Sequence, residues 1–299
     1  RVYRAWLATL PETVQHELEQ HFGPPEKSAM ALRRNGEWFF VIPRHRIGHI
    51  AILPQPPRGE PWQERERALY HSTKSPPSHF YLAAYLWTRE RFASDAIVHF
   101  GGAPMERPWD EVLNSSIIGS YNIYEAARTH GVSRIVYASS VHAIGYHRLE
   151  DQIDAHAPHR PDSLYGLSKC FAEDLGRLYW DKFGIETAAL RIFSSFPEPA
   201  DRRMLWSWLS FDDCIRLVTA ALTAPQVGFT VAFGISDNAV KAVDNRLAAH
   251  LGFHPQDTTE PFRSAVEART PVPDPKAPAV QALGGWFVDL GHPDDEAAK

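Results

Sequence analysis

Arg134-Ile-Val-Tyr-Ala-Ser-Ser140 is a short apolar segment that ends in two hydroxyl side chains, and it decides the fold class of this 299-residue chain. Its apolar residues are continuous rather than alternating, which is typical of a strand buried on both faces of a parallel sheet. Residues 97–100 precede it with the same character, and residues 186–192 and 229–233 follow it. We expect the four segments to lie side by side as parallel strands near 96–100, 134–139, 186–192 and 229–233.

Stretches with helical periodicity separate these predicted strands. They cover residues 108–131, 164–183, 211–223 and 244–251, and Gly131 is placed to end the first of them. Strands that alternate with helices are typical of an α/β fold, in which a Rossmann-like parallel sheet is flanked by helices. The sequence predicts this fold class from Asp95 onward.

Composition limits the class of protein. The chain is 44% apolar and 22% charged, which excludes a disordered, collagen-like or coiled-coil protein. Two cysteines, Cys170 and Cys214, cannot build a disulfide framework, and no run of about 18 apolar residues is present to span a bilayer. The net charge of −5 gives no general attraction for nucleic acid. We therefore expect a cytoplasmic protein that binds neither nucleic acid nor membrane.

The first 94 residues differ in composition from the rest. They contain 13 Lys and Arg, 9 Glu and no Asp, whereas the remainder contains 18 Lys and Arg and 27 Asp and Glu. We predict a domain boundary near Asp95. An atypical segment over residues 1–94 then precedes a catalytic and substrate-binding region over residues 95–299.

Local patterns within the first segment predict few elements. Residues 11–22 and 80–92 have helical character, and two apolar runs at 38–42 and 47–53 favour a hairpin. We consider two origins for the segment. It is either a genuine segment that replaces the N-terminal part of the dinucleotide fold, or a stretch translated in a shifted reading frame of a GC-rich gene. We favour the second hypothesis because the segment is rich in Arg, Pro, His and Trp.

Tyr165 and Lys169 lie four residues apart at the start of the predicted helix 164–183, so their side chains share one face. A nearby ammonium favours the phenolate form of a tyrosine, which is a useful general base. Such a pair often arises by chance. Ser140, however, ends a predicted strand, and polar side chains at carboxyl strand ends lie in the ligand crevice of open α/β sheets. We expect Ser140 and Tyr165 to face one crevice.

Several longer motifs resemble the uronate dehydrogenase family, a branch of the extended short-chain dehydrogenase/reductases or NAD-dependent epimerase/dehydratases. The resemblance covers about residues 95–290. It is carried by Asp95-Ala-Ile-Val-His-Phe-Gly-Gly102, Ser139-Ser-Val-His-Ala-Ile-Gly145, Arg160-Pro-Asp-Ser-Leu-Tyr-Gly-Leu-Ser-Lys169, Phe196-Pro-Glu-Pro199, Arg203-Met-Leu205 and Gly284-Gly-Trp-Phe-Val-Asp289.

The resemblance implies an oxidoreductase of carbohydrate metabolism that uses NAD to oxidise a hexuronate, glucuronate or galacturonate, at C1 to an aldarolactone. It implies catalytic roles for Tyr165 as the base, Lys169 as the holder of the nicotinamide ribose, and Ser140 as a hydrogen-bond donor to the reacting oxygen. The implied substrate-binding residues are Ser140, His142, Ser194 and Arg203. The implied cofactor-binding residues are Gly101, Gly102, Tyr165, Lys169 and Ser195. No histidine or cysteine spacing indicates a metal site.

The chain also departs from the family pattern. Residues 1–94 contain no glycine-rich turn for a diphosphate, so the N-terminal half of the dinucleotide fold is missing or replaced. Family residues are replaced at four further positions, which carry Pro104, Ser116, Val141 and Phe193. We therefore expect impaired activity. The alternatives are a non-catalytic relative or a nucleotide-sugar epimerase or dehydratase, and a homo-oligomer is left open.

Overall fold

The computed structural model describes residues 30–34, 37–41, 50–51 and 96–296 of the chain. A four-stranded parallel sheet lies at the centre of the last range, with the strand order β4-β5-β6-β9. The strands are β4 (Ala96–His99), β5 (Arg134–Ser140), β6 (Glu186–Ile192) and β9 (Phe229–Gly234). This arrangement confirms the predicted α/β fold class and the parallel direction of all four strands.

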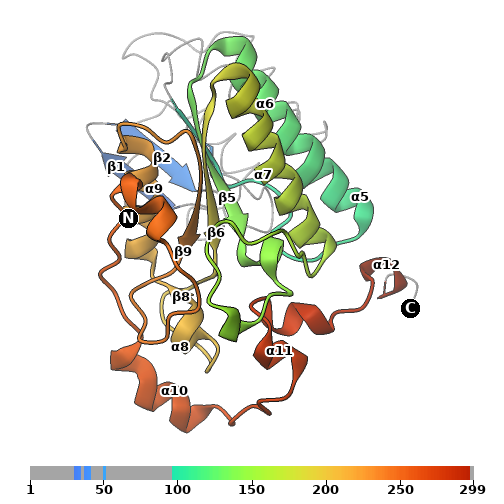
Figure 1. Ribbon diagram of the computed structural model, residues 1–299, viewed down its shortest axis with the longest axis vertical. Coiled ribbons are helices and arrows are strands. Elements are labelled where there is room, and N and C mark those ends of the chain that lie inside the picture. Colours follow the sequence, from blue (N-terminus) through green and yellow to red (C-terminus); the bar gives the residue numbers. More distant parts are fainter. Residues whose placement is uncertain (1–29, 35–36, 42–49, 52–95, 297–299) are drawn as a thin grey trace, which may run out of the picture.

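Helices cover both faces of this sheet (Figure 1). The helices are α5 (Trp109–Val112), α6 (Gly119–His130), α7 (Leu164–Phe183), α9 (Phe211–Thr223) and the 3-10 turn η5 (Arg246–Leu251). A π-helical turn, η2 (Leu113–Ile118), joins α5 to α6. The helix predicted over residues 108–131 therefore forms, but its hydrogen-bond register changes in the middle.

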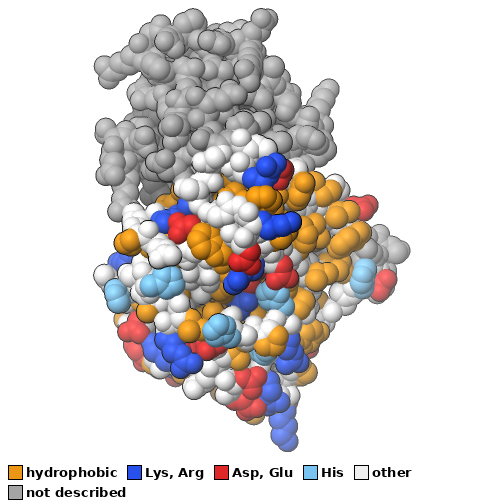
Figure 2. All heavy atoms as spheres, turned by 45° about the horizontal axis from the view of Figure 1, so that its top comes forward, with side chains coloured by type: hydrophobic (Ala, Val, Ile, Leu, Met, Phe, Trp, Pro, Cys, Tyr) orange, Lys and Arg blue, Asp and Glu red, His pale blue; other side chains and the backbone are white. Residues whose placement is uncertain are grey.

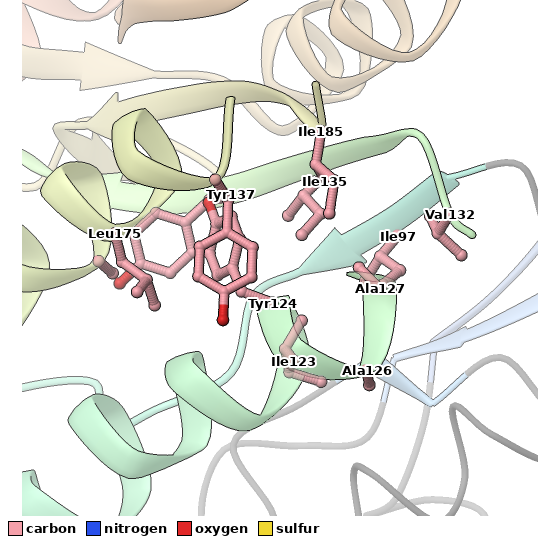
Figure 3. Close-up of a cluster of buried hydrophobic side chains, with 12 residues drawn as sticks. Ile97, Ile123, Tyr124, Ala126, Ala127, Val132, Ile135, Tyr137, Leu175 and Ile185 are labelled. Atoms are coloured by element: carbon pink, nitrogen blue, oxygen red, sulfur yellow. The ribbon is translucent and has the colours of Figure 1, made fainter. Parts of the chain in front are cut away.

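The first core lies between the sheet and helices α6 and α7 (Figure 3). Alternate residues of one strand reach opposite faces, so Ile135 and Tyr137 of β5 enter this core while Val136 enters the other. Tyr124 of α6 is fully buried and shares a hydrogen bond of 3.3 Å with Thr187 of β6. This packing fixes α7, which carries the site, against the carboxyl-terminal half of β5.

The second core lies on the opposite face, under α9 and η5. It contains Val136, Ala188, Leu190, Leu217, Ala221, Ala224, Val227, Ala232, Ala248 and Leu251. Small alanine side chains on β6 and α9 allow helix and sheet to pack closely. With both faces covered, polar groups of the central strands reach solvent or ligand only at the strand ends.

Shorter elements gather at the carboxyl ends of the strands (Figure 1). They are η3 (Val141–Ile144), η4 (Leu149–Asp151), β7 (Ser194–Ser195), α8 (Met204–Ser207), β8 (Trp208–Leu209), η6 (Glu260–Phe262), α10 (Arg263–Arg269), α11 (Pro278–Gln281), η7 (Gly285–Asp289) and α12 (Pro293–Glu296). Strands β7 and β8 pair in parallel as a separate two-stranded sheet. Residues of the candidate site lie on η3, β7 and η7 and at the start of α8.

A second, antiparallel sheet belongs to the N-terminal segment. Its strands are β1 (Met30–Arg34), β2 (Glu37–Val41) and β3 (Ile50–Ala51). The pairing of β2 with β3 agrees with the hairpin predicted over residues 38–53. The helices predicted at 11–22 and 80–92 lie outside the described residues.

Exposed apolar side chains form a stripe along α6 and α7. In Figure 2 hydrophobic side chains gather on the right of the described part, the side where Figure 1 places these helices. The stripe includes Ile118, Tyr121, Leu167, Phe171, Leu178 and Phe183. Stripes of this kind are where protein–protein contacts form, and the homo-oligomer stays a prediction. Among the described helices, none is long and apolar enough to cross a membrane.

Candidate active site

Helix α7 begins at the site because two side chains satisfy its first backbone N–H groups. Ser163 is the N-cap, and its Oγ accepts a hydrogen bond from Gly166 N at 2.9 Å. The carboxylate of Glu106 accepts from Leu164 N at 3.0 Å and from Tyr165 N at 2.8 Å. A carboxylate is favourable at this positive end of the helix, so the loop after β4 is tied to the turn that carries the tyrosine.

Lys169 is buried beside Tyr165, one turn further along α7. Its Nζ donates to Ala138 O at 2.8 Å and lies 5.3 Å from the Tyr165 ring centre and 5.0 Å from that of Tyr137. Within the described residues no carboxylate lies within ion-pair distance of Nζ. Burial lowers the pKa of Lys169 to about 8, and the charge of Glu173 opposes this effect. The ammonium therefore predominates at neutral pH.

This lowered pKa makes stability depend on pH. Between about pH 8 and pH 10.5 the unfolded chain keeps the Lys169 proton that the folded chain has lost, so the free energy of unfolding rises with pH. We expect Lys169 to add about 2–3 kcal/mol to that rise between about pH 7 and pH 10. Urea denaturation of Tyr165→Phe and of Tyr165→Phe/Lys169→Met at both pH values measures it, because Lys169 also interacts with the Tyr165 phenol. Identical pH dependences of these two variants would contradict the prediction.

Ser140 and His142 lie next to this pair, where β5 passes into η3. Ser140 is buried and its Oγ accepts a hydrogen bond from His142 N at 3.3 Å. The His142 ring makes an edge contact with Tyr165, with 5.6 Å between the ring centres. His142 Nδ1 lies 2.8 Å from Asp162 Oδ2. The structure thus brings together Ser140, His142, Tyr165 and Lys169.

Arg203 and Ser194 form a second group. Arg203 Nη1 donates to Ser194 Oγ at 2.9 Å, and Nη2 donates to the carbonyl oxygen of Leu283. The Nε atom is buried without a hydrogen-bond partner in the described part of the chain, and no described carboxylate forms an ion pair with the guanidinium. Burial lowers the pKa of Arg203 to about 10, opposed by the charges of Asp201 and Asp162, so the group stays cationic at neutral pH.

The C-terminal segment joins the two groups. Gly285 lies against Arg203, where a Cβ would meet Nε at 2.5 Å, and its φ of +65° favours glycine. Two residues later, Phe287 stacks on the His142 ring with 3.7 Å between ring centres and an interplanar angle of 27°. The guanidinium and the imidazole are therefore parts of one site.

A buried ion network lies below the site. Glu173 accepts hydrogen bonds from Arg191 at 3.0 and 2.7 Å, from His159 at 2.9 Å, and from Ser139. Burial opposes the charge of Glu173, but the hydrogen bonds of His159 and Arg191 outweigh it and lower its pKa to about 2. Because Ser139 precedes Ser140 and Glu173 follows Lys169 by one turn, this network holds β5, β6 and α7 in register beneath the catalytic candidates.

The predicted cofactor residues are more spread out. Gly101 and Gly102 follow β4, and the hydroxyl of Ser116 on η2 accepts from Ala103 N at 3.0 Å beside them. Ser195 lies on β7 next to Ser194 and is half-buried. The cofactor roles of Gly101, Gly102 and Ser195 stay predictions.

Two of the replaced family positions lie in the protein core. Val141 and Phe193 belong to one buried cluster with Ile144, Phe233 and Leu283, and Phe193 makes edge contacts with Trp206 and Phe233. Phe193 therefore contributes core packing, which the sequence comparison alone did not indicate.

Sequence reasoning missed Asp162, Glu106, Glu173 and Phe287. Asp162 stands within the motif at residues 160–169, directly before the N-cap serine, and that position was the available signal. The other three depend on contacts between distant segments. Within the described residues no three His, Cys, Asp or Glu side chains are grouped to hold a metal ion, and the lack of a metal site stays a prediction.

Comparison with known proteins finds relatives of this chain among the uronate dehydrogenases. The uronate dehydrogenase of Pseudomonas putida is 52% identical over 197 residues, 66% of this chain and 73% of that protein. That of Agrobacterium fabrum is 49% identical over 195 residues, 65% and 74% of the two chains. The crystal structure of a glucuronic acid dehydrogenase from Chromohalobacter salexigens matches with a TM-score of 0.68 and 50% identity, covering 72% of this chain and 81% of that one.

The N-terminal segment resembles a different family. Residues 1–103 match the CobN/Magnesium Chelatase family, while residues 87–205 match the NAD dependent epimerase/dehydratase family. The cobaltochelatase subunit CobN of Sinorhizobium is 33% identical over 99 residues, which are 33% of this chain and 7% of that protein. The reading-frame hypothesis is therefore wrong, because a frame-shifted stretch would not keep such similarity.

The family of the larger region follows from these matches. About half of the aligned residues are identical to those of the uronate dehydrogenases, and the fold of the glucuronic acid dehydrogenase structure matches as well. Through this region the chain belongs to the uronate dehydrogenase family of the NAD dependent epimerase/dehydratases.

Proposed function

We propose that the region from Asp95 onward is built to oxidise a hexuronate, glucuronate or galacturonate, at C1 with NAD as the cofactor, giving an aldarolactone. One observation carries the proposal: a buried Arg203 guanidinium without a described carboxylate partner shares a site with the Tyr165–Lys169 pair. The names of the relatives support it, and one structural neighbour is a mutant uronate dehydrogenase from Agrobacterium tumefaciens complexed with NAD, at 45% identity and a TM-score of 0.67.

The residues of the site divide the chemistry between them. Arg203 binds the uronate carboxylate and orients the sugar. Ser140 donates a hydrogen bond to the oxygen on C1, and Tyr165 as phenolate takes the proton of that hydroxyl group. Lys169 stabilises the phenolate by its charge. NAD, when bound, accepts the hydride that leaves C1.

The residues around Lys169 fit the nicotinamide end of NAD. Lys169 is a buried ammonium whose three N–H groups have one acceptor among the described residues, Ala138 O, so donors remain for a ribose. The diphosphate end lacks a counterpart, because the segment before Asp95 has no glycine-rich cluster and resembles another family. We propose a domain boundary near Asp95, with residues 1–94 outside the dehydrogenase.

This boundary favours a second candidate function. A chain that holds the sugar-acid site but lacks the diphosphate turn binds a uronate without turning it over. Gly101, Gly102 and Ser195 remain the proposed cofactor contacts in either case, and Ser194 and His142 the proposed sugar contacts. We place the protein in the cytoplasm, as its composition predicts.

Replacing Arg203 tests the carboxylate site. We expect Arg203→Met to weaken glucuronate binding about ten- to a hundredfold, because a charge-assisted hydrogen bond contributes roughly 1.5–3 kcal/mol. Isothermal titration calorimetry with glucuronate, galacturonate and neutral glucose measures the effect, and the affinity for glucose should not change.

Arg202 is the matched control. It donates to Thr270 O at 3.2 Å and to Glu267 O at 2.9 Å, away from Ser194 and Leu283. Arg202→Met should leave glucuronate affinity at the wild-type value. Equal losses in the Arg202 and Arg203 variants, or an equal loss for glucose, would remove Arg203 from carboxylate recognition.

A further inference from the structure

We propose that Asp162 is a positioning residue that fixes the tautomer of His142, so that His142 Nε2 accepts a hydrogen bond from a substrate hydroxyl group. The inference rests on the proposed function, because it assigns a role to a carboxylate inside the same sugar-acid site. Within the described ranges, Asp162 is the one acidic side chain that is hydrogen-bonded to a sugar-binding candidate.

Hydrogen bonding decides the position of the proton. The Asp162 side chain is fully buried, and its Oδ2 lies 2.8 Å from His142 Nδ1. Its Oδ1 accepts a hydrogen bond from Ser163 Oγ at 2.8 Å. An ionised carboxylate only accepts, so His142 Nδ1 carries the proton in this contact. In a neutral imidazole the other nitrogen, Nε2, then holds a lone pair.

The ring is held in place by its neighbours. Phe287 stacks on one face of His142 at 3.7 Å, and Tyr165 makes an edge contact at 5.6 Å. No hydrogen bond from a residue in the described ranges reaches Nε2, and the side chain keeps 14% of its surface exposed. Because the stacking holds the ring plane, the Asp162 bond determines which nitrogen remains free for a ligand.

Two glycines create the space for the carboxylate. A Cβ built on Gly145 or on Gly284 would lie 1.8 Å from Asp162 Oδ2, so neither position accepts a side chain without moving it. Gly284 N also donates to Gly145 O at 2.9 Å, which closes the C-terminal segment over the carboxylate. The same segment carries Phe287. Asp162, His142 and this segment therefore form one supporting unit.

The tautomer of His142 determines which groups of a ligand the site can bind. A substrate hydroxyl that donates to His142 Nε2 keeps its oxygen free to accept another hydrogen bond. Ser140 supplies such a donor, since its Oγ accepts from His142 N and its own hydrogen is left to donate. With Arg203 at the other end, the site selects a hydroxy acid in which a hydroxyl donor and a carboxylate are both present.

Nitrogen NMR of the full chain with ¹⁵N-labelled histidine tests the inference. The His142 signals are assigned by their loss in His142→Gln. We expect the wild type to show a protonated Nδ1 and an unprotonated Nε2. Asp162→Asn keeps the shape of the side chain but removes its charge, and we expect a mixture of tautomers together with about tenfold weaker glucuronate binding.

A second variant covers the case in which Asp162→Asn folds poorly. Gly284→Ala displaces the carboxylate without changing it and should give the same mixture of tautomers. Gly291→Ala is its control, because a Cβ there meets nothing within 4 Å, and it should keep the wild-type spectrum.

A doubly protonated ring or a protonated Nε2 in the wild type would overturn the inference, as would a wild-type spectrum in both Asp162→Asn and Gly284→Ala. Glucuronate should shift the Nε2 signal of the wild type. If glucuronate binds in calorimetry but shifts no His142 signal, the hydrogen bond to Nε2 is overturned while the proposed function stands. If glucuronate does not bind at all, the proposed function fails, and a fixed tautomer still supports the positioning role of Asp162.

Discussion

The unmodified chain should form no measurable NADH from glucuronate or galacturonate. In the proposed site, Lys169, Gly101 and Gly102 hold only the nicotinamide end of NAD, and the sequence before Asp95 contains no glycine-rich turn of the kind whose backbone amides bind a diphosphate at a helix N-terminus. Each lost charge-assisted hydrogen bond costs about 1.5–3 kcal/mol, and about 1.4 kcal/mol is a tenfold change in affinity. Several lost bonds move a micromolar site to the millimolar range.

Adding a glycine-rich diphosphate-binding segment should restore the dehydrogenase activity. We expect turnover when the glycine-rich strand–turn–helix segment of the Pseudomonas putida uronate dehydrogenase replaces the residues before Asp95. Absorbance of NADH at saturating NAD measures it. Ser116→Asn, which restores a family residue beside Gly102, should raise the rate further. Phe193 is best retained, because its ring packs against Phe233 and Trp206 and its removal would open a cavity.

Tyr165→Phe in the restored protein should then reduce the rate about a hundred- to ten-thousandfold, the usual contribution of a general base. Tyr179→Phe is a matched control on the same helix, since its hydroxyl donates to Glu125 at 2.5 Å, away from Lys169 and Ser140. Activity that survives Tyr165→Phe would show that another group removes the proton. NADH formation by the unmodified chain would show that residues 1–94 hold the diphosphate after all.

Much of the fold could be predicted because its signals are local. Continuous apolar runs identified β6 to the residue and β5 to within one residue, and Gly131 marked the end of helix α6. The change of helical register over Leu113–Ile118 leaves no such signal, because a π-helical turn needs only one shifted hydrogen bond. The helix predicted over residues 244–251 is a 3-10 turn over Arg246–Leu251, and its sequence likewise does not indicate which hydrogen-bond register forms.

The site was predicted only in part. Tyr165, Lys169 and Ser140 follow from helix spacing and from strand ends, both of which are local patterns. Arg203 stands beside Arg202 in a charged stretch, and the sequence cannot show that Arg203 bonds to Ser194 and Leu283 while Arg202 bonds to Glu267 and Thr270. Asp162 is functional through contacts with His142 and with glycines 17 residues before and 122 residues after it. Such contacts exist only once the tail has folded over the sheet.

The buried ion network should have the largest effect on stability. Glu173 and Arg191 are each about 2% exposed, so removing one partner leaves the other charge without compensation inside the core. We expect Arg191→Met and Glu173→Leu each to lower the free energy of unfolding by about 3–5 kcal/mol. Glu173→Leu should cost more, because Arg191 then lacks any described acidic partner, whereas Glu173 without Arg191 keeps its bonds from His159 and Ser139.

The double variant separates charge compensation from packing. Replacing both partners removes both buried charges, and a buried ion pair exchanged for apolar side chains of similar volume is often neutral in stability. Glu173→Leu/Arg191→Met should therefore recover most of the loss in urea denaturation. Arg177→Met is the control, because the Arg177–Asp181 pair is exposed and should contribute less than about 1 kcal/mol. A double variant no more stable than Glu173→Leu would show that the shapes of these side chains, and not their charges, hold β6 against α7 beneath Ser140 and Lys169.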